Sequence, residues 1–263
     1  MHAADPVPAV FLSHGSPMVA MERGPYQGAL VKLGRRLKAC AVIALSAHWS
    51  SVATVFVSGA DAHDAIYDFG GFPRQLYDLT YSPPGHPTLA KGIANCLSTR
   101  GWKARLIDEG GLDHGVWMPL RLMYPEAEIP VVPLSVPLRL APRQLFELGL
   151  ALAPYRSQGC LILGSGGIVH NRTLFRGGEK DQPPERWARE FDRWFAEKLA
   201  KHDIASLLEY RRLGPHADRA VPTYEHLAPV FIVLGAGCGF RRVETIAGGF
   251  EYGLISMRSF AIA

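Results

Sequence analysis

The stretch Ala41-Val42-Ile43-Ala44-Leu45 carries no polar side chain over its whole length, and it decides the fold class. An apolar run this short is typical of a strand that is covered on both faces, as in the parallel sheets of α/β proteins. Five further runs of this kind lie between glycine, proline or serine residues, and we predict a strand at each: residues 9–12, 54–57, 129–134, 160–163 and 230–234.

Segments with helical periodicity alternate with these runs. In the clearest one, five apolar residues repeat at intervals that place them on one helical face: Trp187, Phe191, Trp194, Phe195 and Leu199. Weaker patterns predict helices at residues 27–40, 88–100 and 143–155. Because strands and helices alternate, we expect an α/β layered sheet. Residues 176–184 are the best candidate for a loop, and we expect one domain over residues 1–263.

The composition is that of an ordinary globular protein. Of the 263 residues, 48% are hydrophobic and 20% are charged, and 28 Lys and Arg against 24 Asp and Glu give a net charge of +4. The basic residues do not cluster, which argues against a nucleic-acid partner. The longest uncharged apolar stretches, such as residues 230–239, are half as long as a bilayer span, so we expect no membrane segment. Residues 1–10 lack the basic start of a signal peptide, and we expect a cytoplasmic protein.

Cysteine usage fits the same compartment. Cys40, Cys96, Cys160 and Cys238 lie far apart without a CxxC pair, which argues against a disulfide framework and against a thiolate zinc site. We expect buried free thiols in a reducing cytosol.

Histidine placement is the main functional signal. Five of the ten histidines stand close to an apolar run or inside a glycine-rich turn: His14, His48, His114, His170 and His226. Any one of them alone is more simply a hydrogen-bonded structural histidine. Binding sites of open α/β sheets form at the carboxyl ends of the strands, so the repeated position predicts that these imidazoles converge there. His226 fits least well because it precedes its apolar run. We expect the other five to be surface or loop residues: His2, His63, His86, His202 and His216.

Converging imidazoles favour a metal site. Neutral imidazole suits Fe, Zn, Cu or Ni, and the absence of HExxH excludes the common zincin arrangement. Neutral ligands leave the metal with its full divalent charge and with open positions, which favours an anionic, chelating substrate. A catechol has this chemistry.

Other motifs carry less. Residues 235–239 (GAGCG) do not match GxGxxG, so close helix–strand packing explains them better than a nucleotide site. Residues 164–167 (GSGG) lack the Lys-Ser/Thr of a phosphate loop, and turn chemistry explains most of these glycines. Without a GxSxG elbow, Ser13, Ser16 and Ser165 are poor candidates for an esterase nucleophile.

Six motifs, in the same order along residues 9–240, resemble the DOPA 4,5-dioxygenase family. They are SHGSP (13–17), SAHW (46–49), YDFGGFP (67–73), GLDHG (111–115), GSGGIVHN (164–171) and the pair Glu225-His226. This family belongs to the class III extradiol ring-cleaving dioxygenases, together with the catalytic subunit of protocatechuate 4,5-dioxygenase. The resemblance implies a single α/β domain with a mixed central sheet covered by helices, and a non-haem Fe(II) centre in which zinc is often found instead.

The resemblance also implies roles for individual residues. His14 and His48 match two metal ligands and His226 matches the third. The wider class uses a carboxylate as the third ligand, so Glu225 is the alternative to His226. His170 matches the acid/base histidine and can also approach the metal, so both roles stay open. His114 matches a residue that hydrogen-bonds the substrate or oxygen.

The implied reaction is the opening of a small catechol ring by O2, with one histidine near neutral pKa taking and returning a proton. Ring surface for such a substrate could come from Trp49, Tyr67, Phe69, Phe72 and Trp117, although core packing explains each of them equally well. Two other functions stay open. One is a mononuclear zinc hydrolase with Glu225 or Asp113 as the base. The other is a non-catalytic binder like the Memo proteins of a related fold branch.

Overall fold

The computed structural model describes residues 6–175, 177–239 and 242–263. His2 lies outside the described residues, and so does Arg176, the first residue of the predicted loop. The described residues form an eight-stranded sheet in the order β4-β3-β5-β2-β6-β1-β10-β7. Its strands are β1 (Ala9–Ser13), β2 (Ala41–Ser51), β3 (Val55–Ser58), β4 (Ala104–Ile107), β5 (Val131–Pro137), β6 (Cys160–Gly166), β7 (Val243–Ala247) and β10 (Ser259–Ile262). A separate hairpin pairs β8 (Phe250–Glu251) with β9 (Ile255–Ser256).

The sheet is mixed, as expected. Strands β5, β2, β6 and β1 run parallel as direct neighbours. The pairs β3–β5, β1–β10 and β10–β7 are antiparallel. Because the four central strands run the same way, their carboxyl ends lie at one edge of the sheet, and the residues that follow them meet there.

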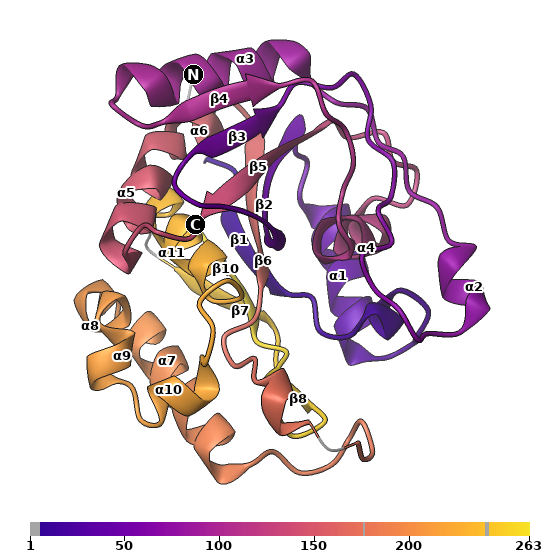
Figure 1. The fold of residues 1–263 in the computed structure, drawn as a ribbon, viewed down its shortest axis with the longest axis vertical. Helices are drawn as coiled ribbons and strands as arrows, with labels where there is room; N and C mark the ends of the chain where they lie inside the picture. The colour runs from indigo at the N-terminus through magenta and orange to yellow at the C-terminus, as the bar shows by residue number, and fades with distance from the viewer. Residues whose placement is uncertain (1–5, 176, 240–241) are drawn as a thin grey trace.

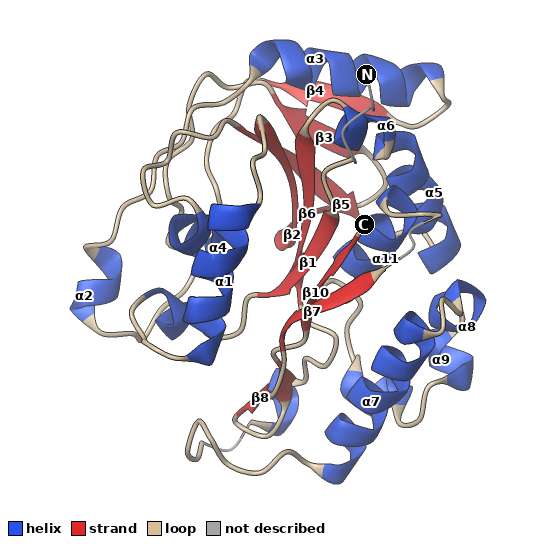
Figure 2. Cartoon of the chain, turned by 180° about the vertical axis from the view of Figure 1, so that it is seen from behind, coloured by secondary structure: helices blue, strands red, loops and turns tan. Residues whose placement is uncertain are grey.

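Helices cover both faces of this sheet. They are α1 (Pro25–Arg36), α2 (Arg74–Tyr77), α3 (Pro87–Thr99), α4 (His114–Met123), α5 (Pro142–Leu152), α6 (Pro154–Ser157), α7 (Arg186–Ala200), α8 (Ile204–Leu208), α9 (Tyr210–Leu213), α10 (Ala217–Ala220) and α11 (Ala228–Ala236), with 3-10 turns η1 (Pro17–Ala20) and η2 (Arg172–Leu174). Figures 1 and 2 show α1 and α4 on one face and α5 and α11 on the other.

Alternate side chains of the central strands supply two hydrophobic cores. Val10 and Leu12 of β1 pack with α1 and α4, whereas Phe11 packs with the layer that contains α5 and α11. Both faces are therefore buried, which is why these strands are apolar at nearly every position. The predicted α/β fold is confirmed; the boundaries 1–263 for the domain stay a prediction.

One predicted strand is wrong. Residues 230–234 lie in the helix α11, in which every residue from Ala228 to Ala236 is buried. This helix lies between α5 and the sheet and is apolar on all sides. A short apolar run has the same sequence pattern in a buried helix as in a buried strand, so the pattern alone could not distinguish the two. Pro229 at its first turn favours the helical start.

The glycines near α11 serve close packing more than turns. A Cβ at Gly235 would lie 1.9 Å from the carbonyl oxygen of Phe146, and one at Gly149 would lie 2.0 Å from that of Ile232. Gly235 therefore allows two helices to touch, and the expected helix–strand packing applies instead to Gly237, which faces Ile262 of β10.

The cysteines are free, as predicted, but only Cys160 is buried. Cys40 and Cys238 are exposed because they lie in the connections before β2 and after α11. Cys96 lies in α3 and is half-buried. Every helix in the described part of the chain is too short or too polar to cross a bilayer. The cytoplasmic location that the sequence predicts is not tested by the fold and stays a prediction.

Candidate metal centre

His14 and His48 come from neighbouring parts of the sheet edge and face each other. His14 directly follows β1, and His48 lies in β2 after the last residue that pairs with β6. Their Nε2 atoms are 3.1 Å apart. Two nitrogens bound to one metal at about 2.1 Å lie roughly 3.0–3.4 Å apart, so this spacing fits a shared ion.

Ser165 determines which nitrogen of His14 carries the proton. Its hydroxyl lies at 2.8 Å from His14 Nδ1 and donates its own hydrogen to the carbonyl of Gly115. Ser165 must therefore accept from Nδ1–H, which leaves a lone pair on Nε2 of His14. The local motif around Ser165 does not reveal this contact. Ser165 of β6 pairs in register with Leu12 of β1, and this pairing brings it to His14.

His114 is held by Asp68. The backbone N–H and the Nδ1 of His114 lie 3.0 Å and 2.9 Å from Asp68 Oδ1, and Asp68 Oδ2 lies 3.5 Å from His48 Nδ1. Because Nδ1 contacts the carboxylate, Nε2 of His114 is the ring nitrogen left for another partner. Asp68 was not among the predicted site residues, although it stands in the motif YDFGGFP.

His226 and His170 form the other side of the cluster. Their rings are stacked, with centroids 3.5 Å apart and planes at 10°, and His226 Nδ1 lies 3.1 Å from Glu225 Oε1. Gly166 at the end of β6 makes this approach feasible, because a Cβ there would lie 2.1 Å from the carbonyl oxygen of His226. His226 precedes a helix instead of following a strand, which explains its unusual position in the sequence.

All five predicted histidines therefore converge. The ring centroid of His14 lies 4.9 Å from that of His48, 5.3 Å from that of His114 and 5.4 Å from that of His226. Two groups have ligand atoms within 4.8 Å of one another: His14, His48 and His114, and His170, Glu225 and His226. The geometry thus adds His114 to the ligand candidates.

Burial favours the neutral form of four of these imidazoles. It lowers the pKa of His14 and His226, that of His48 to about 3 and that of His170 to about 2, and the neighbouring imidazoles add to the effect. The Glu225 carboxylate accepts a hydrogen bond from His226, which lowers its pKa to about 2 despite partial burial. Neutral imidazoles and an ionised carboxylate are the forms that bind metals.

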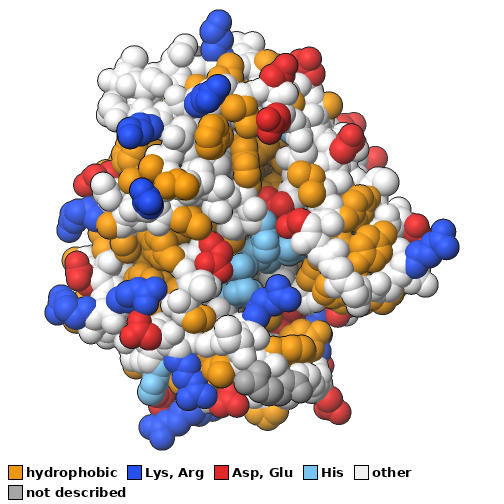
Figure 3. All heavy atoms as spheres, viewed as in Figure 1, with side chains coloured by type: hydrophobic (Ala, Val, Ile, Leu, Met, Phe, Trp, Pro, Cys, Tyr) orange, Lys and Arg blue, Asp and Glu red, His pale blue; other side chains and the backbone are white. Residues whose placement is uncertain are grey.

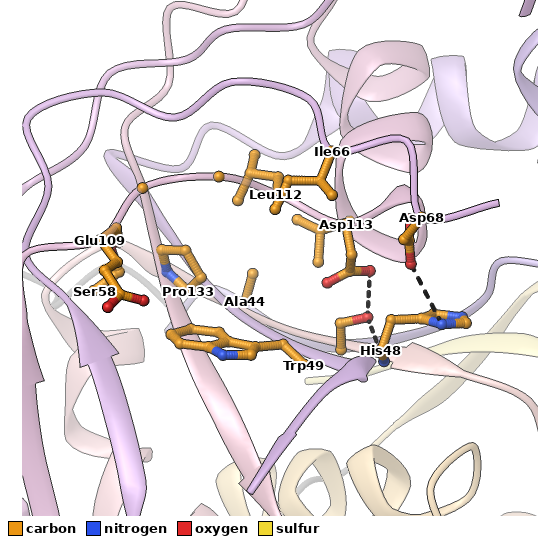
Figure 4. A pocket seen from close by; sticks show the side chains of 14 residues that line it. Ala44, His48, Trp49, Ser58, Ile66, Asp68, Glu109, Leu112, Asp113 and Pro133 are labelled. Atoms are coloured by element: carbon orange, nitrogen blue, oxygen red, sulfur yellow. Dashed lines mark hydrogen bonds and ion pairs between the residues drawn. The ribbon is translucent and has the colours of Figure 1, made fainter. Parts of the chain in front are cut away.

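Two cavities meet at this cluster. The larger has a volume of about 560 Å³ and contains the five imidazoles, Phe69, Phe72 and Arg172 in its wall. Figure 3 shows the histidine side chains in a hollow near the centre of one face, with a basic side chain beside them. The smaller, of about 200 Å³, lies on the other side of His48 and Asp68 (Figure 4).

The predicted aromatic surface divides between these cavities and the core. Phe69 and Phe72 line the larger cavity and Trp49 the smaller one. Trp117 is fully buried, and its indole N–H donates to the carbonyl of Ile66, so it belongs to the core. Tyr67 is partly buried against Trp117.

The remaining histidines lie outside the cluster. His63 is buried, contrary to expectation, because its ring bridges the carbonyl of Val131 and the N–H of Gly111. His86 caps α3 by accepting from the N–H of Leu89, and His202 and His216 are exposed.

Fold and cluster together are those of an α/β protein with a candidate non-haem metal centre at the carboxyl ends of its strands. Residues 8–261 match the family model described as the catalytic LigB subunit of aromatic ring-opening dioxygenase, and the chain belongs to this family. The predicted family and enzyme class, a non-haem ring-opening dioxygenase, are thereby confirmed.

Relatives cover nearly the whole chain. A protein of Beta vulgaris named 4,5-DOPA dioxygenase extradiol is 36% identical over 255 residues, which span 95% of this chain and 94% of that protein. One of the same name from Escherichia coli strain K12 is also 36% identical, over 97% of this chain and 94% of its own length. A crystal structure of an uncharacterized Escherichia coli K12 protein has a TM-score of 0.82 and 32% identity, and the match covers 98% of this chain and 100% of that one.

Proposed function

We propose that this protein is an extradiol dioxygenase that inserts both atoms of O2 into a catechol ring beside the diol and so opens the ring. One observation carries the proposal: His14, His114 and His226 each direct Nδ1 to a protein acceptor, so their Nε2 atoms converge on one cavity. Fixing the tautomer in this way is typical of metal-binding histidines. The relatives named 4,5-DOPA dioxygenase extradiol support a catechol as substrate.

We assign the metal to His14, His48 and His226, with His114 and His170 close enough to contribute. The donor set fits a divalent transition metal, because it combines neutral imidazoles with a nearby carboxylate. We expect Fe(II) for catalysis, and Zn(II) also suits these ligands. When bound, the metal supplies a Lewis-acidic centre with open positions for a catechol and O2.

His170 is the residue that we assign to proton transfer. Its ring borders the larger cavity, where it can accept a proton from a catechol hydroxyl and return it during ring opening. Burial lowers its pKa to about 2, below the near-neutral value expected for this role. An anionic substrate next to the ring counteracts the effect of burial on its pKa. The Nε2 of His114 is suited to accept a hydrogen bond from the second hydroxyl.

A zinc hydrolase would use Asp113 or Glu225 as its base, and both carboxylates are hydrogen-bonded within the protein. Asp113 accepts from the Ser46 hydroxyl at 2.6 Å and from the N–H of Gly115 at 2.9 Å at the start of α4, so it is occupied as a helix cap. Glu225 accepts from Thr223 at 2.8 Å and from His226. These hydrogen bonds all end on Oδ1 of Asp113 and on Oε1 of Glu225, so they orient both carboxylates. The oxygen-uptake experiment distinguishes the hydrolase from the dioxygenase.

The test is oxygen uptake. Protein loaded with Fe(II) without oxygen should consume O2 when a catechol is added, and a yellow ring-opened product should form in equal amount. A Memo-like binder or a hydrolase would consume none, so absence of uptake with a range of catechols would rule the proposal out.

A further inference from the structure

Arg172 is a charged residue of the larger cavity that the reaction itself does not use. It begins the turn η2, two residues after His170, and it is exposed at the cavity wall. Within the part of the chain that the structure describes, no carboxylate pairs with Arg172. Both nearby carboxylates have other partners: Asp68 binds His114 and His48, and Glu225 binds His226 and Thr223.

The backbone that carries Arg172 is held in place on both sides. His170 donates its N–H to the carbonyl of Ala220 at 3.0 Å. The buried Asn171 donates its amide to the carbonyl of Arg219 at 2.7 Å and accepts from the N–H of Thr173 at 3.1 Å. The backbone at Arg172 is therefore held in a fixed position at the cavity wall.

The charge of Arg172 reaches the imidazole cluster. Beyond burial, which is the largest cause, and the neighbouring imidazoles, its positive charge also lowers the pKa of His48, His170 and His226. Arg172 and the five imidazoles line the same cavity, so one small molecule in that cavity can contact both.

The smaller cavity has the opposite charge. Figure 4 shows Asp68, Asp113 and Glu109 around it, with Asp68 directed toward His48. A negatively charged substituent on the substrate is repelled from this side and attracted to the side of Arg172, so the two cavities together orient the ring.

We propose that Arg172 is a specificity-determining residue that binds a carboxylate on the side chain of the catechol. The guanidinium fork matches a carboxylate with two parallel hydrogen bonds, and Phe69 and Phe72 provide apolar surface for the ring between it and the metal site. The inference rests on the function proposed above and adds the residue that distinguishes an anionic catechol from a neutral one.

The experiment compares two catechols of similar size, 3-(3,4-dihydroxyphenyl)propanoate and the neutral 4-propylcatechol. Their dissociation constants are measured by calorimetry on the Zn(II)-loaded protein, and their kcat/KM on the Fe(II)-loaded protein. We expect the carboxylate to be preferred, and Arg172→Gln to reduce the preference about 10- to 100-fold in both measurements. Arg172→Lys should retain part of it, because a lysine keeps the charge but not the fork.

Arg189→Gln is the matched control, because it removes the same charge from the exposed face of α7, outside both cavities. Its preference should equal that of the parent protein. If Arg172→Gln keeps the full preference in binding, or if the parent protein shows none, the inference is wrong. Loss of turnover with both catechols, with the binding preference intact, would contradict the dioxygenase proposal and leave the role of Arg172 standing.

Discussion

At the scale of single residues, the site depends on side chains that control the imidazoles. Ser165, Asp68 and Glu225 each accept from the Nδ1 of one histidine. These contacts orient the rings before any ligand arrives, and in metal sites the loss of such a partner typically costs 10- to 100-fold in metal affinity or activity. The metal and the proton-transfer roles are tested at this scale.

His14→Ala and His48→Ala should lose the metal, because their Nε2 atoms face each other at 3.1 Å. Metal content per chain after dialysis, measured by elemental analysis, checks this. His216→Ala is the control, since that ring is exposed and bound to Glu190 outside the cluster. Full occupancy in His14→Ala would show that the ligand assignment is wrong. For the third ligand, we expect loss in His226→Ala and retention with weakened affinity in Glu225→Gln.

His170→Ala should retain the metal and lose turnover by at least about 100-fold, the usual effect of removing a general base. The ring of His170 stacks on His226 and is not the Nδ1 partner of His14, His114 or His226. Removing it therefore leaves these three hydrogen bonds in place. Metal content and kcat measured on the same preparation separate the two roles. Loss of metal together with activity would identify His170 as a ligand.

At the scale of secondary structure elements, the packing of α5 against α11 depends on glycine at the contact. Gly149→Ala places a methyl group against the backbone of α11, and we expect a loss of about 1–3 kcal/mol or more in the free energy of unfolding. Gly92→Ala in α3 is the matched control, since its Cβ meets no atom within 4 Å. That change should stabilise the protein by about 0.5–1 kcal/mol, because alanine favours helix. Urea denaturation measures both, and equal effects would contradict the packing argument.

At the scale of the whole molecule, the buried imidazoles couple folding to pH. In the unfolded chain a histidine binds a proton near pH 6.5, whereas burial lowers the pKa of His48 to about 3 and that of His170 to about 2. Between these values the unfolded state binds more protons, so stability is fully present above pH 6.5 and decreases as the pH falls. The slope is about 1.4 kcal/mol per pH unit for each such imidazole.

Urea denaturation of the chelator-treated protein at pH 7.5 and at pH 5.5 checks this coupling. We expect a clearly lower midpoint at pH 5.5, and a smaller difference in His48→Gln, which removes one of the buried imidazoles. A midpoint that stays constant over this range would show that the imidazoles accept protons in the folded protein.

The sequence by itself determined the layered α/β class and five of the six predicted strands, because burial on both faces makes a strand apolar at nearly every position. It also indicated which five histidines converge, because most of them stand near the ends of apolar runs. Only the tertiary structure decided that residues 230–234 are helical, since a segment buried on all sides has no polar face to reveal its period. It also brought Ser165 and Asp68 into contact with the histidines. Their partners are up to 151 residues away in the chain, as in the pair of His14 with Ser165, and contacts of that range follow from the register of the strands rather than from local pattern.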